Sequence, residues 1–183
     1  FGKGSMLVLG SNTPNDFIEF SADSLIVDEY DRCVAENLAL ARDRVRASPD
    51  PQLFRVGNPT IPRTGIADLY DKGDQRVYFH RCQRCNTLQP LNWIGSFVHK
   101  DDDGKWIAFD VQRSKDRRKD IRPKCQNCGQ LFERTSAGGQ WVATKPTEPK
   151  RSYTMSRLDC IDQDIHTLIV EWNEAQSNTT KLI

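Results

Sequence analysis

Two adjacent carboxylates, Asp28 and Glu29, directly follow the apolar run Leu25 to Val27. A short apolar run of this kind is typical of a buried strand, which would deliver both acids to the edge of a sheet. In a Walker B motif the first acid holds Mg²⁺, usually through water, and the second orients the water that attacks a γ-phosphate. We therefore predict that Asp28 and Glu29 are catalytic acids. The alternative is a solvated helix start, where both carboxylates stabilise the positive end of the helix dipole.

A second candidate element is the tetrapeptide Gly57, Asn58, Pro59 and Thr60, which follows the apolar run Leu53 to Val56. In nucleotide-driven motors a polar residue at the tip of the neighbouring strand senses the γ-phosphate and couples hydrolysis to movement. We predict this coupling role for the tetrapeptide. An ordinary turn is the alternative, because Gly, Asn and Pro favour turns in any protein.

A phosphate-binding loop of the form G-x4-G-K-[ST] is not found in the 183 residues. The Gly2-Lys3 dipeptide near the start lacks the upstream strand, the spaced first glycine and the following Ser or Thr. We therefore expect the chain to begin downstream of such a loop, and we expect it to be inactive as an ATPase by itself.

Four cysteines form two pairs with the overall pattern C-x2-C-x39-C-x2-C, namely Cys82, Cys85, Cys125 and Cys128. Closely spaced thiolates of this kind suit tetrahedral Zn²⁺, and four protein ligands leave no open position for catalysis. The residue after each pair, Asn86 or Gly129, tolerates the left-handed backbone that a zinc knuckle needs there. We predict a structural zinc site. The alternatives are unrelated buried cysteines, or an altered site that includes His80, for which a partly exposed strand position is the simpler interpretation.

A basic run between the two cysteine pairs is a candidate nucleic-acid contact. Its members are Arg113, Lys115, Arg117, Arg118, Lys119, Arg122 and Lys124. Positive side chains on a flexible loop can bind phosphates without reading sequence. The net charge of +1 supplies no global basic field, so the prediction depends on this local cluster. A solvated loop balanced by Asp101 to Asp103 is the alternative.

The expected elements form an α/β chain. The composition is that of a soluble globular protein, with 37% hydrophobic and 28% charged residues, and no apolar run approaches the roughly 18 residues that span a membrane. We expect strands at 6–9, 25–27 and 53–56, with helices at about 14–20 and 34–45 between them. Strands that alternate with helices predict a parallel sheet.

From Tyr78 onward the pattern changes to short strands, with a hairpin turn at Asp103-Gly104 before the strand that contains Trp106. A final helix has an apolar face formed by Ile165, Leu168, Ile169 and Trp172. Trp93, Trp106 and Trp141 are expected to pack around the small zinc core. We predict three parts: an α/β core at 1–77, a zinc-ribbon-like insert at 78–144, and a linker with a helix at 145–183.

The stretches VDEYD, EN followed by ARDR, GNPT, and the two cysteine knuckles occur in an order that resembles the large terminase subunit of lambda-type tailed bacteriophages. The resemblance covers nearly the whole chain. It implies the central portion of a P-loop-type ATPase core, with Asp28 and Glu29 as Walker B acids and Gly57 to Thr60 as the coupling motif. The phosphate-binding lysine and the nuclease acid cluster of the family have no counterpart here.

By this resemblance the intact protein is an ATP-driven motor that packages viral DNA, with a nuclease activity in a further C-terminal part. The implied cofactors are ATP, Mg²⁺ and structural Zn²⁺. The implied partners are double-stranded DNA, the small terminase subunit, the portal protein and further copies of the chain, in the host bacterial cytoplasm. Two other hypotheses remain: a non-enzymatic zinc-ribbon module that binds nucleic acid, and a helicase-type ATPase fragment. An upstream phosphate-binding loop would exclude the first, and a downstream nuclease acid cluster would exclude the second.

Overall fold

The computed structural model describes residues 4–18, 20–135 and 138–177. The chain divides into two compact units, Phe1–Lys72 and Gly73–Ile183. Within the described part, no helix is both long and apolar enough to cross a membrane. Gly2 and Lys3 lie outside the described residues.

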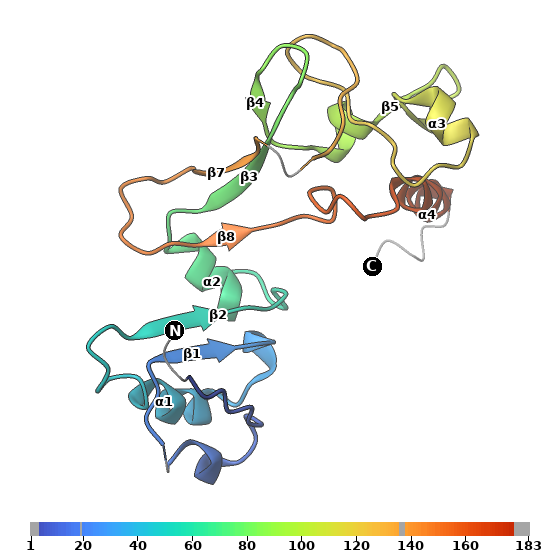
Figure 1. The fold of residues 1–183 in the computed structure, drawn as a ribbon. Coiled ribbons are helices and arrows are strands. Elements are labelled where there is room, and N and C mark those ends of the chain that lie inside the picture. The colour runs from blue at the N-terminus through green and yellow to red at the C-terminus, as the bar shows by residue number, and fades with distance from the viewer. Residues whose placement is uncertain (1–3, 19, 136–137, 178–183) are drawn as a thin grey trace. The chain divides into compact units, whose positions relative to one another are not determined.

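The first unit contains a two-stranded parallel sheet and short helices (Figure 1). Its elements are η1 (Pro14–Phe17), β1 (Ser24–Val27), η2 (Tyr30–Arg32), α1 (Ala35–Asp43), β2 (Gln52–Arg55) and α2 (Gly65–Asp71). β1 pairs with β2 from Ser24 opposite Gln52 to Val27 opposite Arg55. The predicted strand–helix–strand order and the parallel pairing are therefore confirmed for β1, α1 and β2.

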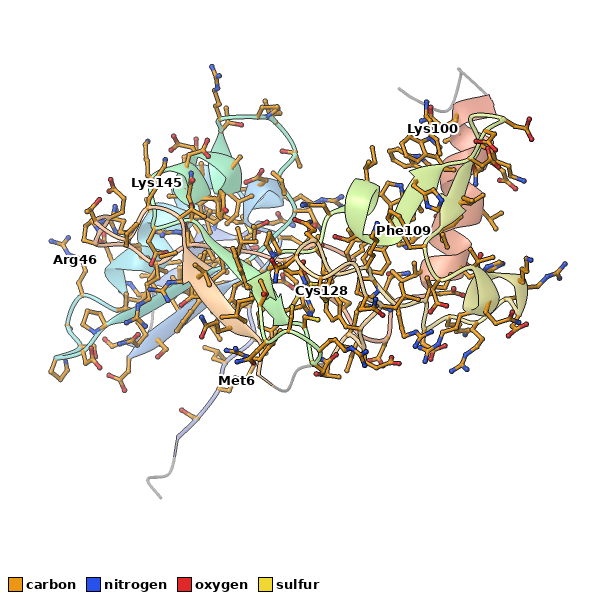
Figure 2. The ribbon with its side chains drawn as sticks, turned by 90° about the horizontal axis from the view of Figure 1, so that it is seen from above. Met6, Arg46, Lys100, Phe109, Cys128 and Lys145 are labelled. Carbon is orange, nitrogen blue, oxygen red and sulfur yellow. The ribbon has the colours of Figure 1, made fainter. Side chains whose placement is uncertain are left out.

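The predicted strand at 6–9 is wrong. Figure 2 shows Met6 on an extended segment, which forms no β-ladder within the described residues. The side chains of Met6 and Val8 are 86% and 79% exposed. A four-residue apolar run carries too little periodicity to identify a strand, and an extended segment becomes a strand only when a neighbour satisfies its N–H and C=O groups. The helix expected at 14–20 is also shorter, a single 3₁₀ turn over Pro14–Phe17.

The second unit is built on β3 (Arg76–Arg81). β4 (Leu88–Gln89) and β7 (Gln140–Ala143) pair with β3 antiparallel, and β8 (Tyr153–Thr154) pairs with it parallel (Figure 1). The remaining elements are η3 (Trp93–Phe97), β5 (Val98–Lys100), β6 (Trp106–Ala108), α3 (Val111–Lys115) and α4 (Ile165–Ser177). β5 and β6 form an antiparallel hairpin, and Gly104 has a left-handed φ of 77° in its turn, as predicted.

The hydrophobic core of this unit surrounds two of the cysteines, Cys82 and Cys125, and includes Phe97, Ile121 and Ile165. The predicted packing of tryptophans against this core is confirmed for Trp93 and Trp106. It is wrong for Trp141, whose ring instead packs edge-on against Tyr78 and Tyr153 of the β3 sheet. Trp141 lies on β7, and cross-strand neighbours on one face of a sheet are close enough for such aromatic contacts.

The last helix, α4, has the expected apolar face. Ile165 and Ile169 are buried, and Leu168 packs against the same core. Trp172 is the exception, because it is 37% exposed and lies beside the ring of Trp93. The helix face predicted from periodicity therefore identifies the buried side, and its last aromatic residue lies at the edge of that side.

Candidate functional site

The two predicted motifs of the first unit lie at one edge of its sheet. Parallel strands present their carboxyl ends at the same edge. Asp28 and Glu29 come directly after β1, and Gly57 is two residues after β2. Backbone hydrogen bonds continue past the strands: Val56 N donates to Val27 O at 2.8 Å, and Tyr30 N donates to Val56 O at 3.0 Å. Tertiary pairing thus brings together residues about 30 positions apart in the sequence.

The backbone of Glu29 has an uncommon conformation. Its φ and ψ are 49° and 47°, in the left-handed region that residues other than glycine rarely adopt. Two hydrogen bonds hold it there: Glu29 N donates to Asp28 Oδ1 at 2.9 Å, and Arg32 N donates to Glu29 O at 2.8 Å. Both carboxylates are exposed, and Glu29 Oε2 lies 3.5 Å from Arg32 Nε. The sharp turn therefore directs two solvent-accessible acids away from the end of β1.

The tetrapeptide Gly57 to Thr60 passes close to this turn. A Cβ atom placed on Gly57 would lie 3.0 Å from Tyr30 N and 3.5 Å from two backbone atoms of Glu29. Glycine permits this approach because it has no side chain. The other members, Asn58, Pro59 and Thr60, are exposed. The structure thus brings the tetrapeptide beside the acid pair.

Asp31 is a residue of this site that the sequence did not single out. Its Oδ1 accepts from Ile66 N at 2.6 Å, and its Oδ2 accepts from Thr60 N at 3.1 Å and Thr60 Oγ1 at 3.2 Å. The backbone N–H groups of Ile66 and Thr60 lower the pKa of Asp31 below its ordinary value. In the sequence Asp31 is one more acid in an acid-rich stretch, and no local signal distinguishes it from a solvated carboxylate.

A cavity of about 480 Å³ lies within the first unit. Its lining comes from β1, η2, α1, β2 and the segment before α2, and includes Leu25, Val27, Asp31, Leu38, Arg42, Leu53, Arg55, Thr60 and Gly65. Asp28 and Glu29 are not among its lining residues. The cavity therefore belongs to the Asp31 side of the sheet edge, and the acid pair faces solvent.

The four paired cysteines of the second unit form one cluster, in which the ligand atoms all lie within 4.8 Å of one another. Each pair makes the same turn. Asn86 N donates to Cys82 O at 2.9 Å, and Gly129 N donates to Cys125 O at 2.9 Å. Asn86 and Gly129 have φ values of 62° and 73°, so the predicted left-handed positions are confirmed.

The cluster fits a tetrahedral metal ion. With a Zn–S bond of about 2.3 Å, the sulfur atoms of a tetrahedral site are about 3.8 Å apart. The Sγ atoms of Cys82 and Cys128 are 3.8 Å apart, and those of Cys85 and Cys125 are 3.6 Å apart. The Thr87 hydroxyl, 3.3 Å from Cys85 Sγ, is the first of several groups that lower the pKa of Cys85 to about 5, which favours the thiolate that a metal needs. Despite the backbone hydrogen bond of Gln130, burial and the neighbouring thiols raise the pKa of Cys128 to about 11. The four thiols can therefore bind a metal such as zinc.

His80 is not part of this cluster, and the expectation of a partly exposed position is wrong. The side chain is buried on β3, and its Nε2 lies 3.1 Å from Asp159 Oδ1. Asp159 Oδ2 also accepts from the backbone and hydroxyl of Ser156. A residue far along the chain therefore pairs with Nε2 of this histidine, whereas its buried Nδ1 has no hydrogen-bond partner among the described residues. Sequence spacing to Cys82 could not show this pairing.

Three of the seven residues in the basic run, all arginines, form ion pairs. Arg113 is the most enclosed member: its side chain is 16% exposed and contacts Asp110, Asp120 and Glu133. Arg118 pairs with Asp120, and Arg122 pairs with Asp110. Lys124 Nζ lies 4.4 Å from the centroid of the Phe109 ring, whose position is labelled in Figure 2. The acids that balance the run are therefore these three carboxylates rather than Asp101 to Asp103.

Buried Asp110 organises this network. It is 2% exposed, and its Oδ2 accepts from Arg122 Nε at 2.8 Å. Burial raises the pKa of Asp110, but hydrogen bonds from Arg122 and Arg113 outweigh it, so the pKa lies below its ordinary value. Three members of the run, Lys115, Arg117 and Lys119, are exposed and form no ion pair with any described residue. These three carry the charge that remains available to a polyanion.

A comparison of the sequence with known protein families gives a match. The sequence model described as phage terminase large subunit gpA, ATPase domain, matches residues 1–177. No curated protein and no solved structure matches the chain. The matched range includes both the acid edge and the cysteine cluster, and the resemblance to large terminase subunits is confirmed. The chain belongs to the phage terminase large subunit gpA family, and the match is to the ATPase domain of that family.

Proposed function

We propose that Phe1–Lys72 carries the acids that bind Mg²⁺ and activate water in an ATP-driven DNA-packaging motor. Membership in the family implies ATP hydrolysis by the intact protein and a role in phage DNA packaging. One observation supports the finer assignment most directly. The acid pair and the coupling tetrapeptide meet at one strand edge, where a Cβ on Gly57 would lie 3.0 Å from Tyr30 N.

The two acids have different roles in this proposal. Asp28 is the ligand, usually through water, of a Mg²⁺ ion that neutralises phosphate charge. Glu29 accepts a proton from the attacking water and orients it. Its left-handed backbone supports such a role, because strained conformations of about 1–3 kcal/mol cluster at functional sites. Gly57 to Thr60 sense the γ-phosphate. We also propose that the first unit belongs to a P-loop-type core, although the motif G-x4-G-K-[ST] is not found in the 183 residues.

The cysteine cluster is proposed as a structural zinc site, because four cysteine ligands would leave no open coordination position. We further propose double-stranded DNA, the small terminase subunit, the portal protein and other copies of this chain as partners in the host cytoplasm. A nuclease activity would reside in another part of the protein. The domain limits 1–77, 78–144 and 145–183 remain a proposal as well.

The acid pair is tested in the full-length subunit with DNA present. Asp28→Ala should weaken Mg·ATP binding and also turnover. Glu29→Gln keeps the shape and removes the charge, so it should preserve ATP binding and lower kcat about 10²-fold or more, as expected for loss of a general base. Glu36→Gln is the matched control, because Glu36 is an exposed acid in the first turn of α1. Near-normal turnover of Glu29→Gln would show that the acid pair only begins a helix, and would leave the zinc-ribbon module as the better function.

A further inference from the structure

Hydrogen bonds of Asp31 connect three segments of the first unit, namely η2, the segment at Thr60 and α2. Asp31 belongs to η2, immediately after the acid pair. One carboxylate oxygen accepts from the backbone of Ile66 in α2, and the other accepts from the backbone and hydroxyl of Thr60. All three partners are donors, so the site requires two acceptor oxygens. An amide would turn its NH₂ toward one of these donors.

The backbone opposite Asp31 is shaped for this carboxylate. Gly65 has a φ of 54°, and a Cβ atom there would lie 2.1 Å from Asp31 Oδ1. Any other residue at position 65 would therefore displace the carboxylate as well as strain the backbone. The start of α2 and the side chain of Asp31 thus form one close-packed contact.

Backbone hydrogen bonds connect the turn of Asp31 to Glu29, the proposed catalytic acid. Arg32 N donates to Glu29 O at 2.8 Å, which closes the turn that contains Asp31. Tyr30 N donates to Val56 O at 3.0 Å, which ties the same turn to the end of β2. Thr60, Asp31 and Glu29 are therefore linked by a single three-residue turn and its hydrogen bonds.

We propose that Asp31 is a positioning residue that makes the acid turn, the coupling tetrapeptide and α2 move as one piece. The proposal rests on the proposed function. When Thr60 shifts on loss of the γ-phosphate, its hydrogen bonds to Asp31 carry the displacement to α2. Without Asp31, the tetrapeptide shifts alone and hydrolysis is no longer converted into movement of DNA.

The test measures base pairs moved per ATP hydrolysed, together with KM for ATP and thermal stability, in the full-length subunit assembled on DNA. Asp31→Asn should lower the distance moved per ATP about tenfold or more, as expected for lost hydrogen bonds to a charged group, and should change KM far less. Thr60→Val removes one of the same contacts and keeps the bond from Asp31 to Ile66. The effects of the two changes on the distance moved per ATP should be non-additive. The double variant should therefore move DNA no less per ATP than the more impaired of the two single variants.

Thr60→Ser keeps the hydroxyl and should restore coupling. Asp43→Asn is the control, because Asp43 is an exposed acid whose ion pair among the described residues is with Arg46. The proposal is overturned if Asp31→Asn and Thr60→Val both couple normally, or if their effects on coupling simply add. It is also overturned if turnover and coupling fall in proportion to lost stability. Failure of the proposed function would appear separately, as normal turnover of Glu29→Gln.

Discussion

Zinc should stabilise the second unit, and the stabilisation should rise with the logarithm of the free Zn²⁺ concentration. A ligand that binds only the folded state adds about 1.4 kcal/mol to the free energy of unfolding for each tenfold increase in free concentration above Kd. The second unit, Gly73–Ile183, has roughly 110 residues. For a domain near that size, 1 kcal/mol shifts Tm by about 4 °C. We therefore expect Tm to rise by about 6 °C per decade of free Zn²⁺.

The structure supplies both the reason and the probe. Cys82 and Cys125 are 0% exposed and belong to the hydrophobic core. A metal bound by both thiols would therefore cross-link two chain segments within that core. All four tryptophans of the chain lie between residues 93 and 172, within this unit. Their fluorescence during thermal unfolding in zinc-buffered solutions at constant pH therefore reports on this unit.

Two variants make the experiment decisive. Cys125→Ser should abolish the dependence of Tm on zinc, because it removes one of the four ligands. Cys160→Ser should leave it unchanged, because Cys160 is exposed and outside the cluster. A Tm of the unchanged chain that ignores free zinc would refute the reasoning, and so would an equal slope in Cys125→Ser.

Two further predictions concern the second unit. In DNA binding, the double change Arg117→Ala with Lys119→Ala should reduce the slope of log affinity against log salt by about 2. Arg118→Ala should change this slope little, because Arg118 is already ion-paired with Asp120. Equal slopes in all variants would assign the run to the solvated surface. For pH, burial raises the pKa of Asp159 but the hydrogen bond from His80 and those from Ser156 hold it below the ordinary 3.8. Its contribution is therefore present above pH 3.8 and lost as pH falls through the lower folded pKa. Asp159→Asn should be destabilised by about 1–3 kcal/mol at neutral pH, and denaturation at several pH values should show the difference shrinking below pH 3.8; a constant difference would contradict the assignment.

Local sequence patterns were sufficient for features that depend on near neighbours. The apolar run before Asp28 predicted the strand β1 but not its burial, because Val27 is buried whereas Ile26 is 66% exposed. The cysteine spacing predicted the cluster, since each C-x2-C pair closes its own turn. Asn86 and Gly129 could be assigned a left-handed backbone because residue type alone limits which positions tolerate it.

Features set by distant partners were decided only by the tertiary structure. Sequence alone could not show that Asp31 binds Thr60 and Ile66, because each hydrogen bond spans roughly 30 residues. The pairing of Arg113 is partly local, because Asp110 lies three residues away, but its pair with Glu133 spans 20 residues and was not predicted from the sequence.

For the segment 6–9, the sequence predicted a strand that the structure does not contain. Its apolar residues satisfied the local pattern of a strand, yet no described strand lies alongside to accept its hydrogen bonds. Residue type and spacing thus determined the chemistry available to this chain, the acid pair and the four thiols. Which groups are joined, buried or left exposed depends on contacts between remote segments, and only the folded chain makes those contacts.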